Sequence, residues 1–320
     1  MNIKKYMTPV LTAAGLLAAV NTYAEIELAE GLTATGFIDM SMGTVENGLD
    51  TDPYGQLDQV EIDLFYDFGT GTTARVDLND LGDGVVVEQA YIGVELPNNF
   101  SLTIGKFLSS LGFEGPEPVD LWQYSYSANI LAYPGYSNGA ALGYATDSFS
   151  LYGSVLDGSF DSDGDFSNPS YEVQLKLFPT EGLVIQAGYA TQKFDKVYAE
   201  EDVPLVEEYD QGIFNIWAQY QTGGWTVAGE YNFVQEAGET GADGDGYLVM
   251  VNYAFNDKFA LTIRTSAVSL DNGYEDTEYT ISPSWTINEN LFALLEARTD
   301  DYSDDQLDGE SYAAELIFSF

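Results

Sequence analysis

Hydrophobic and polar residues alternate with a period of two along most of this chain. At its end Tyr312, Ala314, Leu316, Phe318 and Phe320 share one face, and the residues between them are mostly small or polar. Alternation of this kind predicts a strand with one apolar face. Chain ends usually fray in water, so a strand that closes on Phe-Ser-Phe is expected to face lipid.

The same alternation predicts about sixteen strands, separated alternately by short turns and longer acidic loops. Aromatic residues cluster beside the short turns, which is typical of a bilayer interface. The strands are expected near residues 32–40, 60–68, 74–79, 90–96, 100–104, 140–144, 149–155, 171–177, 183–189, 214–220, 225–233, 247–255, 259–266, 278–285, 293–298 and 311–320. The longer loops are expected near 43–56, 80–85, 109–138, 157–169, 193–211, 237–245, 269–276 and 300–309.

An even number of antiparallel strands with alternating loop lengths favours an all-β fold, a transmembrane β-barrel of the bacterial outer membrane. A soluble β-sandwich also alternates apolar and polar residues. It gives no reason for alternating loop lengths or for an aromatic end. We therefore expect one barrel domain over residues 25–320.

The first 24 residues have the features of a cleaved signal peptide. Lys4 and Lys5 precede an apolar run over residues 10–20, and Thr22-Tyr23-Ala24 places small residues at the cleavage positions. The alternative is a membrane anchor, but the run is shorter than the ~20 residues that span a bilayer. We expect cleavage after Ala24.

The sequence contains no Cys and no His. This excludes a disulfide framework, Ser-His nucleophiles and His-ligated zinc. Carboxylate-only chemistry stays open without positive support, so we expect neither an enzyme nor an organic cofactor.

The chain is strongly acidic, with 10 Lys+Arg against 52 Asp+Glu and a net charge of −42. Removal of Lys4 and Lys5 with the leader takes the net charge to −44. Such a field repels nucleic acid, which is excluded as a partner. Adaptation to a saline habitat would explain the many acids on water-exposed loops, and a cation-attracting pore would be a further consequence of the same charge.

The side chains expected to face inward are also acidic on balance, with four bases against eleven acids and a net charge of −7. The bases are Arg75, Lys176, Arg264 and Arg298, and the acids are Asp39, Glu61, Asp63, Asp67, Asp77, Glu95, Glu172, Glu230, Glu278, Glu296 and Glu315.

The longest connection, residues 109–138, is too apolar to extend into water. It carries Phe113, Trp122, Tyr124 and Tyr126 among other aromatic residues. A long loop without secondary structure is usually functional or disordered, and its aromatic content argues against disorder. We expect it to pack on the inner wall of the barrel.

The closing Ser319-Phe320 and the stretch Gly105-Lys106-Phe107, with Gly112-Phe113-Glu114-Gly115, resemble the general porins of Gram-negative bacteria and related β-barrel porins. The resemblance implies a sixteen-stranded barrel whose long third external loop, after strand five, is folded into the lumen as a constriction. The residues expected in that loop are Glu114, Glu117, Asp120, Trp122, Tyr124 and Tyr126, and those on the pore-lining wall are Arg75, Lys106, Arg264, Arg298, Glu61, Asp63, Asp77 and Glu230.

In general porins the acids of this loop face a ladder of arginines. This sequence offers only scattered bases, so the resemblance does not carry that charge separation over. It does imply a location in the outer membrane of a Gram-negative bacterium, contact with its lipid and lipopolysaccharide, recognition of Phe320 by the assembly machinery, and a homotrimer.

Two acidic runs, Asp161-Ser-Asp-Gly-Asp165 and Asp243-Gly-Asp245, suit oxygen-only calcium ligation. Neither completes a twelve-residue calcium loop. Asp161, Asp163 and Asp165 therefore form a weak candidate for Ca²⁺, and an ordinary acidic turn is the alternative.

The leading hypothesis is a channel for passive diffusion of ions and small hydrophilic solutes, with a preference for cations. The alternative is a structural or adhesive surface barrel whose acidic external loops bind divalent ions.

Overall fold

The computed structural model describes residues 25–47, 51–129, 133–160, 164–194, 197–200, 203–206, 209–237, 241–303 and 308–320. These residues are almost entirely strand, apart from one 3-10 turn, η1 (Pro118–Asp120). The strands are β1 (Ile26–Ala29), β2 (Leu32–Asn47), β3 (Thr51–Asp67), β4 (Thr72–Asp80), β5 (Val86–Leu96), β6 (Phe100–Leu108), β7 (Tyr136–Ala145), β8 (Phe149–Leu156), β9 (Ser170–Thr180), β10 (Leu183–Phe194), β11 (Val197–Glu200), β12 (Val203–Val206), β13 (Tyr209–Thr222), β14 (Trp225–Ala237), β15 (Ala242–Asn256), β16 (Phe259–Leu270), β17 (Glu275–Asn288), β18 (Leu291–Tyr302) and β19 (Gly309–Ser319).

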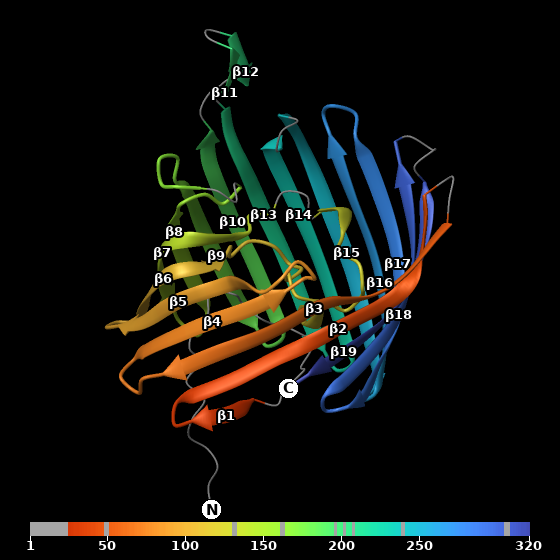
Figure 1. Cartoon of the computed structure of the whole chain (residues 1–320), viewed down its shortest axis with the longest axis horizontal. Helices are drawn as coiled ribbons and strands as arrows, with labels where there is room; N and C mark the ends of the chain where they lie inside the picture. The colour runs from red at the N-terminus through yellow and green to blue at the C-terminus, as the bar shows by residue number, and fades with distance from the viewer. Residues whose placement is uncertain are drawn as a thin grey trace, which may run out of the picture.

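Within the described residues, β2–β10 and β13–β19 form a closed antiparallel barrel of sixteen strands, as predicted (Figure 1). The barrel closes where β19 pairs with β2, in a register that sets Ser319 opposite Phe37. Gly36 and Phe320 then exchange two backbone hydrogen bonds of 2.9 and 3.0 Å. The short β1 pairs with the start of β2, beyond the end of β19. Closure leaves the sheet without an unpaired edge.

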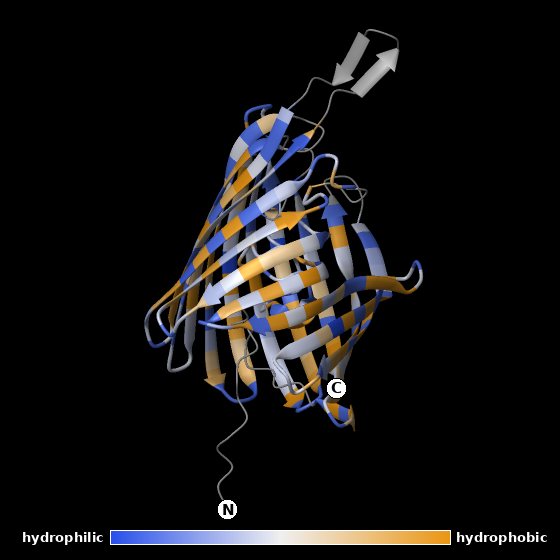
Figure 2. Ribbon diagram, turned by 90° about the vertical axis from the view of Figure 1, so that its left-hand side faces the viewer, coloured by the Kyte–Doolittle hydropathy of each residue, from blue (hydrophilic) through white to orange (hydrophobic). Residues whose placement is uncertain are grey.

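Hydrophobic and hydrophilic residues alternate along the strands, as the colours of Figure 2 show. The exposed fractions of the side chains place the apolar residues outward and the polar residues inward. On β16, Ile263 is 54% exposed, whereas the neighbouring Thr262 and Arg264 are buried. The neighbouring strands repeat this arrangement, which is the reverse of a water-soluble core. An apolar outer face with all backbone groups paired is what the bilayer interior demands of a barrel.

Aromatic side chains are in contact at the short-turn end of the barrel. This is the place predicted for an interfacial girdle, and amphipathic rings favour the headgroup level of a bilayer. The ring centroids are 4.3 Å apart for Trp225–Tyr253, 5.3 Å for Phe255–Phe259, 5.5 Å for Phe259–Trp285 and 5.0 Å for Phe100–Tyr144.

Two of the expected loops are shorter than predicted. Most of the loop expected at 43–56 is strand, because β2 and β3 stay paired as far as Glu46 and Thr51. The region 193–211 contains the β11–β12 hairpin. Backbone pairing requires no apolar alternation, so polar strand ends escape a search by periodicity. Among the described residues, no helix is long and apolar enough to cross a membrane.

The closing seam provides a test of the barrel. A Cβ atom at Gly36 would lie 2.4 Å from the Glu61 carbonyl oxygen and 2.8 Å from the Phe320 ring. We expect Gly36→Ala to destabilise the folded barrel by about 1–3 kcal/mol, the usual cost of overpacking. Gly229→Ala is the matched control, because its Cβ would meet nothing closer than 3.7 Å. Urea unfolding in detergent micelles, followed by tryptophan fluorescence, measures both variants. Equal stability of the two would contradict the packing described for the seam.

Candidate functional site: the barrel wall and the loop packed on it

The segment 109–129, which follows β6, is held by hydrogen bonds to carboxylates of the barrel wall. Four buried glutamates from four strands accept its backbone N–H groups. These bonds run from Ser110 to Glu172 on β9 (3.2 Å), from Phe113 to Glu230 on β14 (2.9 Å), from Tyr124 to Glu296 on β18 (2.8 Å) and from Ala128 to Glu278 on β17 (2.9 Å). A buried carboxylate is costly unless it is hydrogen-bonded, and these N–H groups satisfy the carboxylates while fixing the segment.

A buried ion pair strengthens the attachment. Arg264 of β16 is 1% exposed, and one of its terminal nitrogens lies 2.8 Å from Glu114 Oε1. The same guanidinium donates to the backbone carbonyl oxygens of Ser125 (2.7 Å) and Tyr126 (3.1 Å). Glu114 also accepts from the backbone N–H of Ser127 (2.9 Å). The predicted wall residue Arg264 therefore lies beneath the segment, where it is paired with the predicted loop residue Glu114.

Apolar residues on the inner face complete the contact. Trp122 packs on Ala228, Leu248 and Met250, and its ring stacks on Phe113 at 5.9 Å. Two further inner-face patches receive the segment: Leu111 meets Ala190, Ile213 and Val234, and Val119 meets Phe37 and Ile317. These inner-face residues interrupt the polar side of their strands where the segment lies on them.

Acidic side chains of the segment meet acidic side chains of β3 and β5. The carboxylate oxygens of Glu117, Glu61 and Glu88 lie within 4.8 Å of one another. Burial and the neighbouring Asp120 raise the pKa of Glu117 well above its ordinary value. Burial also raises the pKa of Asp120 to about 6, against the opposing effect of Arg75.

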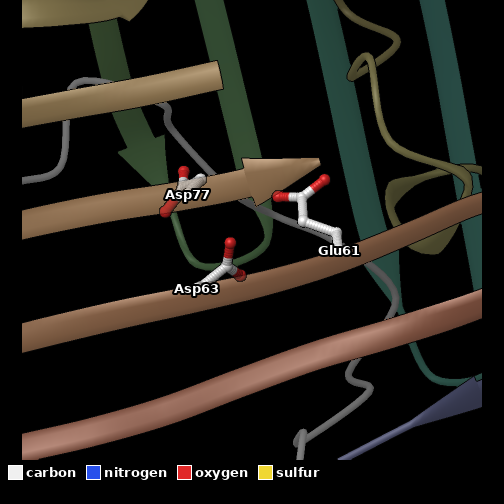
Figure 3. A group of neighbouring side chains, drawn as sticks. All are labelled: Glu61, Asp63 and Asp77. Atoms are coloured by element: carbon white, nitrogen blue, oxygen red, sulfur yellow. The ribbon is translucent and has the colours of Figure 1, made fainter. Parts of the chain in front are cut away.

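A second acidic group adjoins the first. Figure 3 shows Glu61 and Asp63 on β3 and Asp77 on β4 with their carboxylates gathered between the two strands. Arg75 pairs with two acids of this group. Its Nε lies 2.7 and 2.9 Å from the two oxygens of Asp77, and a terminal nitrogen lies 3.6 Å from Asp63. The charge of Arg75 is therefore already paired.

The inner space beside β4–β6 is free of the segment. A cavity of about 410 Å³ lies there, lined by Thr73, Arg75, Gln89, Tyr91 and Glu95 among other residues. The segment thus makes its hydrogen bonds mainly with β9–β18. Its acidic turn, which carries Glu117 and Asp120, faces β3–β5.

The other predicted loop residues differ in exposure. Trp122 is buried, whereas Tyr126 is 36% exposed and its hydroxyl donates to the Pro116 carbonyl oxygen. The Tyr124 hydroxyl lies 3.0 Å from Ser41 Oγ on β2. Arg298 contacts Glu278 (2.9 Å) and stays partly exposed.

Lys106 does not lie on the inner wall where it was predicted. It pairs with Ala90, which alternates with the buried Gln89, and it shares the face of Ile104, which is 53% exposed. Strand alternation therefore directs Lys106 to the outer face, where its Nζ donates to the Val87 carbonyl oxygen (3.0 Å). The motif match had placed it by sequence position alone.

Of the weak calcium candidate, Asp161 and Asp163 lie outside the described residues. Asp165 is exposed and accepts hydrogen bonds from the backbone N–H and the hydroxyl of Ser167. Its predicted metal role stays a prediction.

One acid of this region, Glu88, was missed by the sequence reasoning. Glu88 occupies a β-bulge in β5, where Asp77 pairs with Gln89 and Leu78 with Val87. A bulge can re-aim a side chain, and the Glu88 carboxylate accepts from Asn79 Nδ2 (2.7 Å). Periodicity cannot reveal an extra residue of this kind.

A closed barrel that is apolar outside and polar inside is the architecture of bacterial outer-membrane β-barrel proteins. Residues 38–319 match the family model described as "Putative beta-barrel porin-2, OmpL-like", and the chain belongs to this family of outer-membrane proteins. No curated protein matches the sequence.

Solved structures share the fold at low sequence identity. OmpT of Vibrio cholerae superposes with a TM-score of 0.69 at 13% identity, covering 92% of this chain and 100% of that one, and a further OmpT structure is described as a trimer form. OprB of Pseudomonas putida gives 0.72 at 10% identity, covering 91% and 94%. An anion-selective porin from Comamonas acidovorans gives 0.65 at 13% identity, covering 90% and 99%.

Removal of the buried arginine tests how the segment is held. We expect Arg264→Gln to loosen residues 113–127, because Glu114 would stay buried without its charge partner, a loss of about 3–5 kcal/mol. Hydrogen exchange of the segment measures the effect. Arg75→Gln is the matched control, since Arg75 pairs with acids of β3 and β4. Unchanged protection in Arg264→Gln would contradict the anchoring role.

Proposed function

We propose that this protein is an outer-membrane channel for passive diffusion of ions and small hydrophilic solutes, that the segment 109–129 narrows its lumen, and that it prefers cations. The observation that carries the proposal is that the segment and the part of the wall that it faces, β3–β5, are both acidic. Glu117 and Asp120 of the segment lie near Glu61, Asp63 and Glu88 of the wall.

The size of the barrel supports a water-filled passage. About eight strands enclose a bore that side chains fill, whereas sixteen or more leave an aqueous channel. The segment is attached to one side of this bore and leaves space beside β4–β6. A hydrophilic solute would pass through this remaining space, next to the turn of the segment that carries Glu117 and Asp120.

The distribution of charge supports the preference for cations. Arg264 is covered and paired with Glu114, and Arg75 is paired with Asp77, so neither base offers a free positive charge to the passage. A narrow aqueous pore with a low-dielectric wall concentrates the field of its acids and enriches cations. The Comamonas porin shares the fold yet is described as anion-selective. Selectivity is therefore a property of the charges at the constriction and not of the barrel.

We further propose that the barrel assembles as a homotrimer, as the trimer form of OmpT suggests. The exposed apolar face would contact outer-membrane lipid and lipopolysaccharide. Phe320, at the closing seam, is the expected signal for the assembly machinery.

Single-channel recording in a planar bilayer under a KCl gradient tests the function. We expect a reversal potential that favours K⁺ and weakens at high salt, because the Debye length falls to about 3 Å at 1 M. Asp120→Asn should reduce the preference for K⁺. Asp165→Asn, which removes an exposed acid from the connection between β8 and β9, should leave the preference unchanged. A preference for chloride would contradict the proposal. Negligible conductance would favour the alternative, a structural or adhesive surface barrel with acidic, divalent-binding loops.

A further inference from the structure

Glu61 belongs to two neighbouring groups of carboxylates, and only one of them is supplied with positive charge. In the first group Asp63 and Asp77 are paired with Arg75, and Gln89 donates a further hydrogen bond to Asp77 (2.6 Å). In the second, Glu88 and Glu117 make no ion pair with a basic side chain among the described residues, and Arg75 acts on Glu117 only at longer range. The second group is therefore the one that lacks a counter-charge.

Two buried oxygen atoms in this second group make no hydrogen bond of normal geometry. Glu61 is fully buried, and its Oε2 accepts from Gln59 (3.0 Å). Its Oε1 makes no such bond among the described residues, and Glu88 Oε2 makes none either, although the Tyr136 hydroxyl lies beside Glu88. Buried acceptors are normally satisfied by a donor, a water molecule or an ion.

The uncharged side chain of Asn79 is a second indication of an ion, separate from the acids. Asn79 is 2% exposed, lies opposite Glu61 in the β3–β4 register, and donates from Nδ2 to Glu88 Oε1 (2.7 Å). This bond holds the amide group beside the carboxylates. Its carbonyl oxygen, Oδ1, is buried and has no partner among the described residues. A buried carbonyl oxygen without a partner, on a side chain bonded to Glu88, is a further oxygen ligand available at this place.

We propose that Glu61, Glu88 and Glu117, together with Asn79 Oδ1, form a binding site for a divalent cation of the calcium type inside the barrel. The carboxylate oxygens lie within 4.8 Å of one another. Ca²⁺ accepts about six to eight oxygen ligands in flexible geometry, including carboxylates and amide carbonyl groups. Mg²⁺ demands near-ideal octahedral geometry and usually keeps several of its waters, so a set of protein oxygens from three strands and a loop suits Ca²⁺ better.

The site joins the loop to the wall. Glu117 belongs to the segment 109–129, whereas Glu61 and Glu88 belong to β3 and β5. A bound ion would replace mutual repulsion by three charge-assisted contacts across the gap.

Isothermal titration of the full-length, detergent-solubilised protein with CaCl₂, after treatment with a chelator, tests the site. We expect one saturable site that binds Mg²⁺ more weakly. Glu61→Gln and Glu117→Gln should each weaken Ca²⁺ binding by about tenfold or more. Glu95→Gln, which removes one charge from the strand that carries Glu88, should leave binding unchanged.

Folding of each variant is checked by heat-modifiable migration on gels and by tryptophan emission, and Glu117→Gln lies outside the strands. No saturable binding, binding unchanged in folded Glu61→Gln, or an equal loss in Glu95→Gln would overturn the proposal. A reduction of K⁺ conductance by micromolar to millimolar Ca²⁺ is also expected, and this expectation rests on the proposed function. If Ca²⁺ binding depends on Glu61 but the barrel does not conduct, the calcium site is supported and only the proposed channel function is contradicted.

Discussion

The hydrogen bonds between wall carboxylates and the backbone of the segment 109–129 determine how the inside of this barrel is arranged. A loop without secondary structure has many backbone N–H groups to satisfy, and a buried carboxylate needs donors. Glu172, Glu230, Glu278 and Glu296 meet both requirements at once. Arg264 adds the charge that lets Glu114 stay buried between them.

This anchoring divides the inner wall into two parts with different roles. The acids on β9, β14, β17 and β18 are used as hydrogen-bond acceptors, and the segment covers them. Those on β3–β5 stay beside the acidic turn that contains Glu117 and Asp120. Unpaired negative charge is therefore concentrated in the gap between the segment and β3–β5. Both the proposed cation preference and the proposed calcium site follow from that concentration.

Much of the fold could be predicted because a bilayer imposes a simple pattern. The outer face must be apolar and the strands must close. Alternation of apolar and polar residues therefore predicts the number of strands and the face of residues such as Ile263 and Arg264. Lys106 was misplaced because a local motif was followed in preference to the alternation of Ile104 and Phe107. The β2–β3 hairpin was shortened in the prediction because its paired polar ends, such as Ser41 with Gln56, carry no apolar signal.

Alternation along a strand predicts which face of the sheet a residue lies on, but it does not predict which other residue it contacts. For this reason the contacts between the wall and the segment could not be predicted from the sequence. It placed Arg264 and Glu230 inward without revealing that the segment covers them. One signal was available: Leu248, Met250 and Ile213 are apolar at inward positions, and each packs beneath the segment. Glu88 had no such signal, because its direction depends on a bulge.

The central claim is that the segment 109–129 restricts the passage through the barrel. Single-channel conductance of a variant in which residues 113–127 are replaced by a short Gly-Ser link measures this most directly, with correct folding verified by heat-modifiable migration. A clear rise in conductance over the unmodified protein is the predicted result. Conductance equal to that of the unmodified barrel would contradict the account.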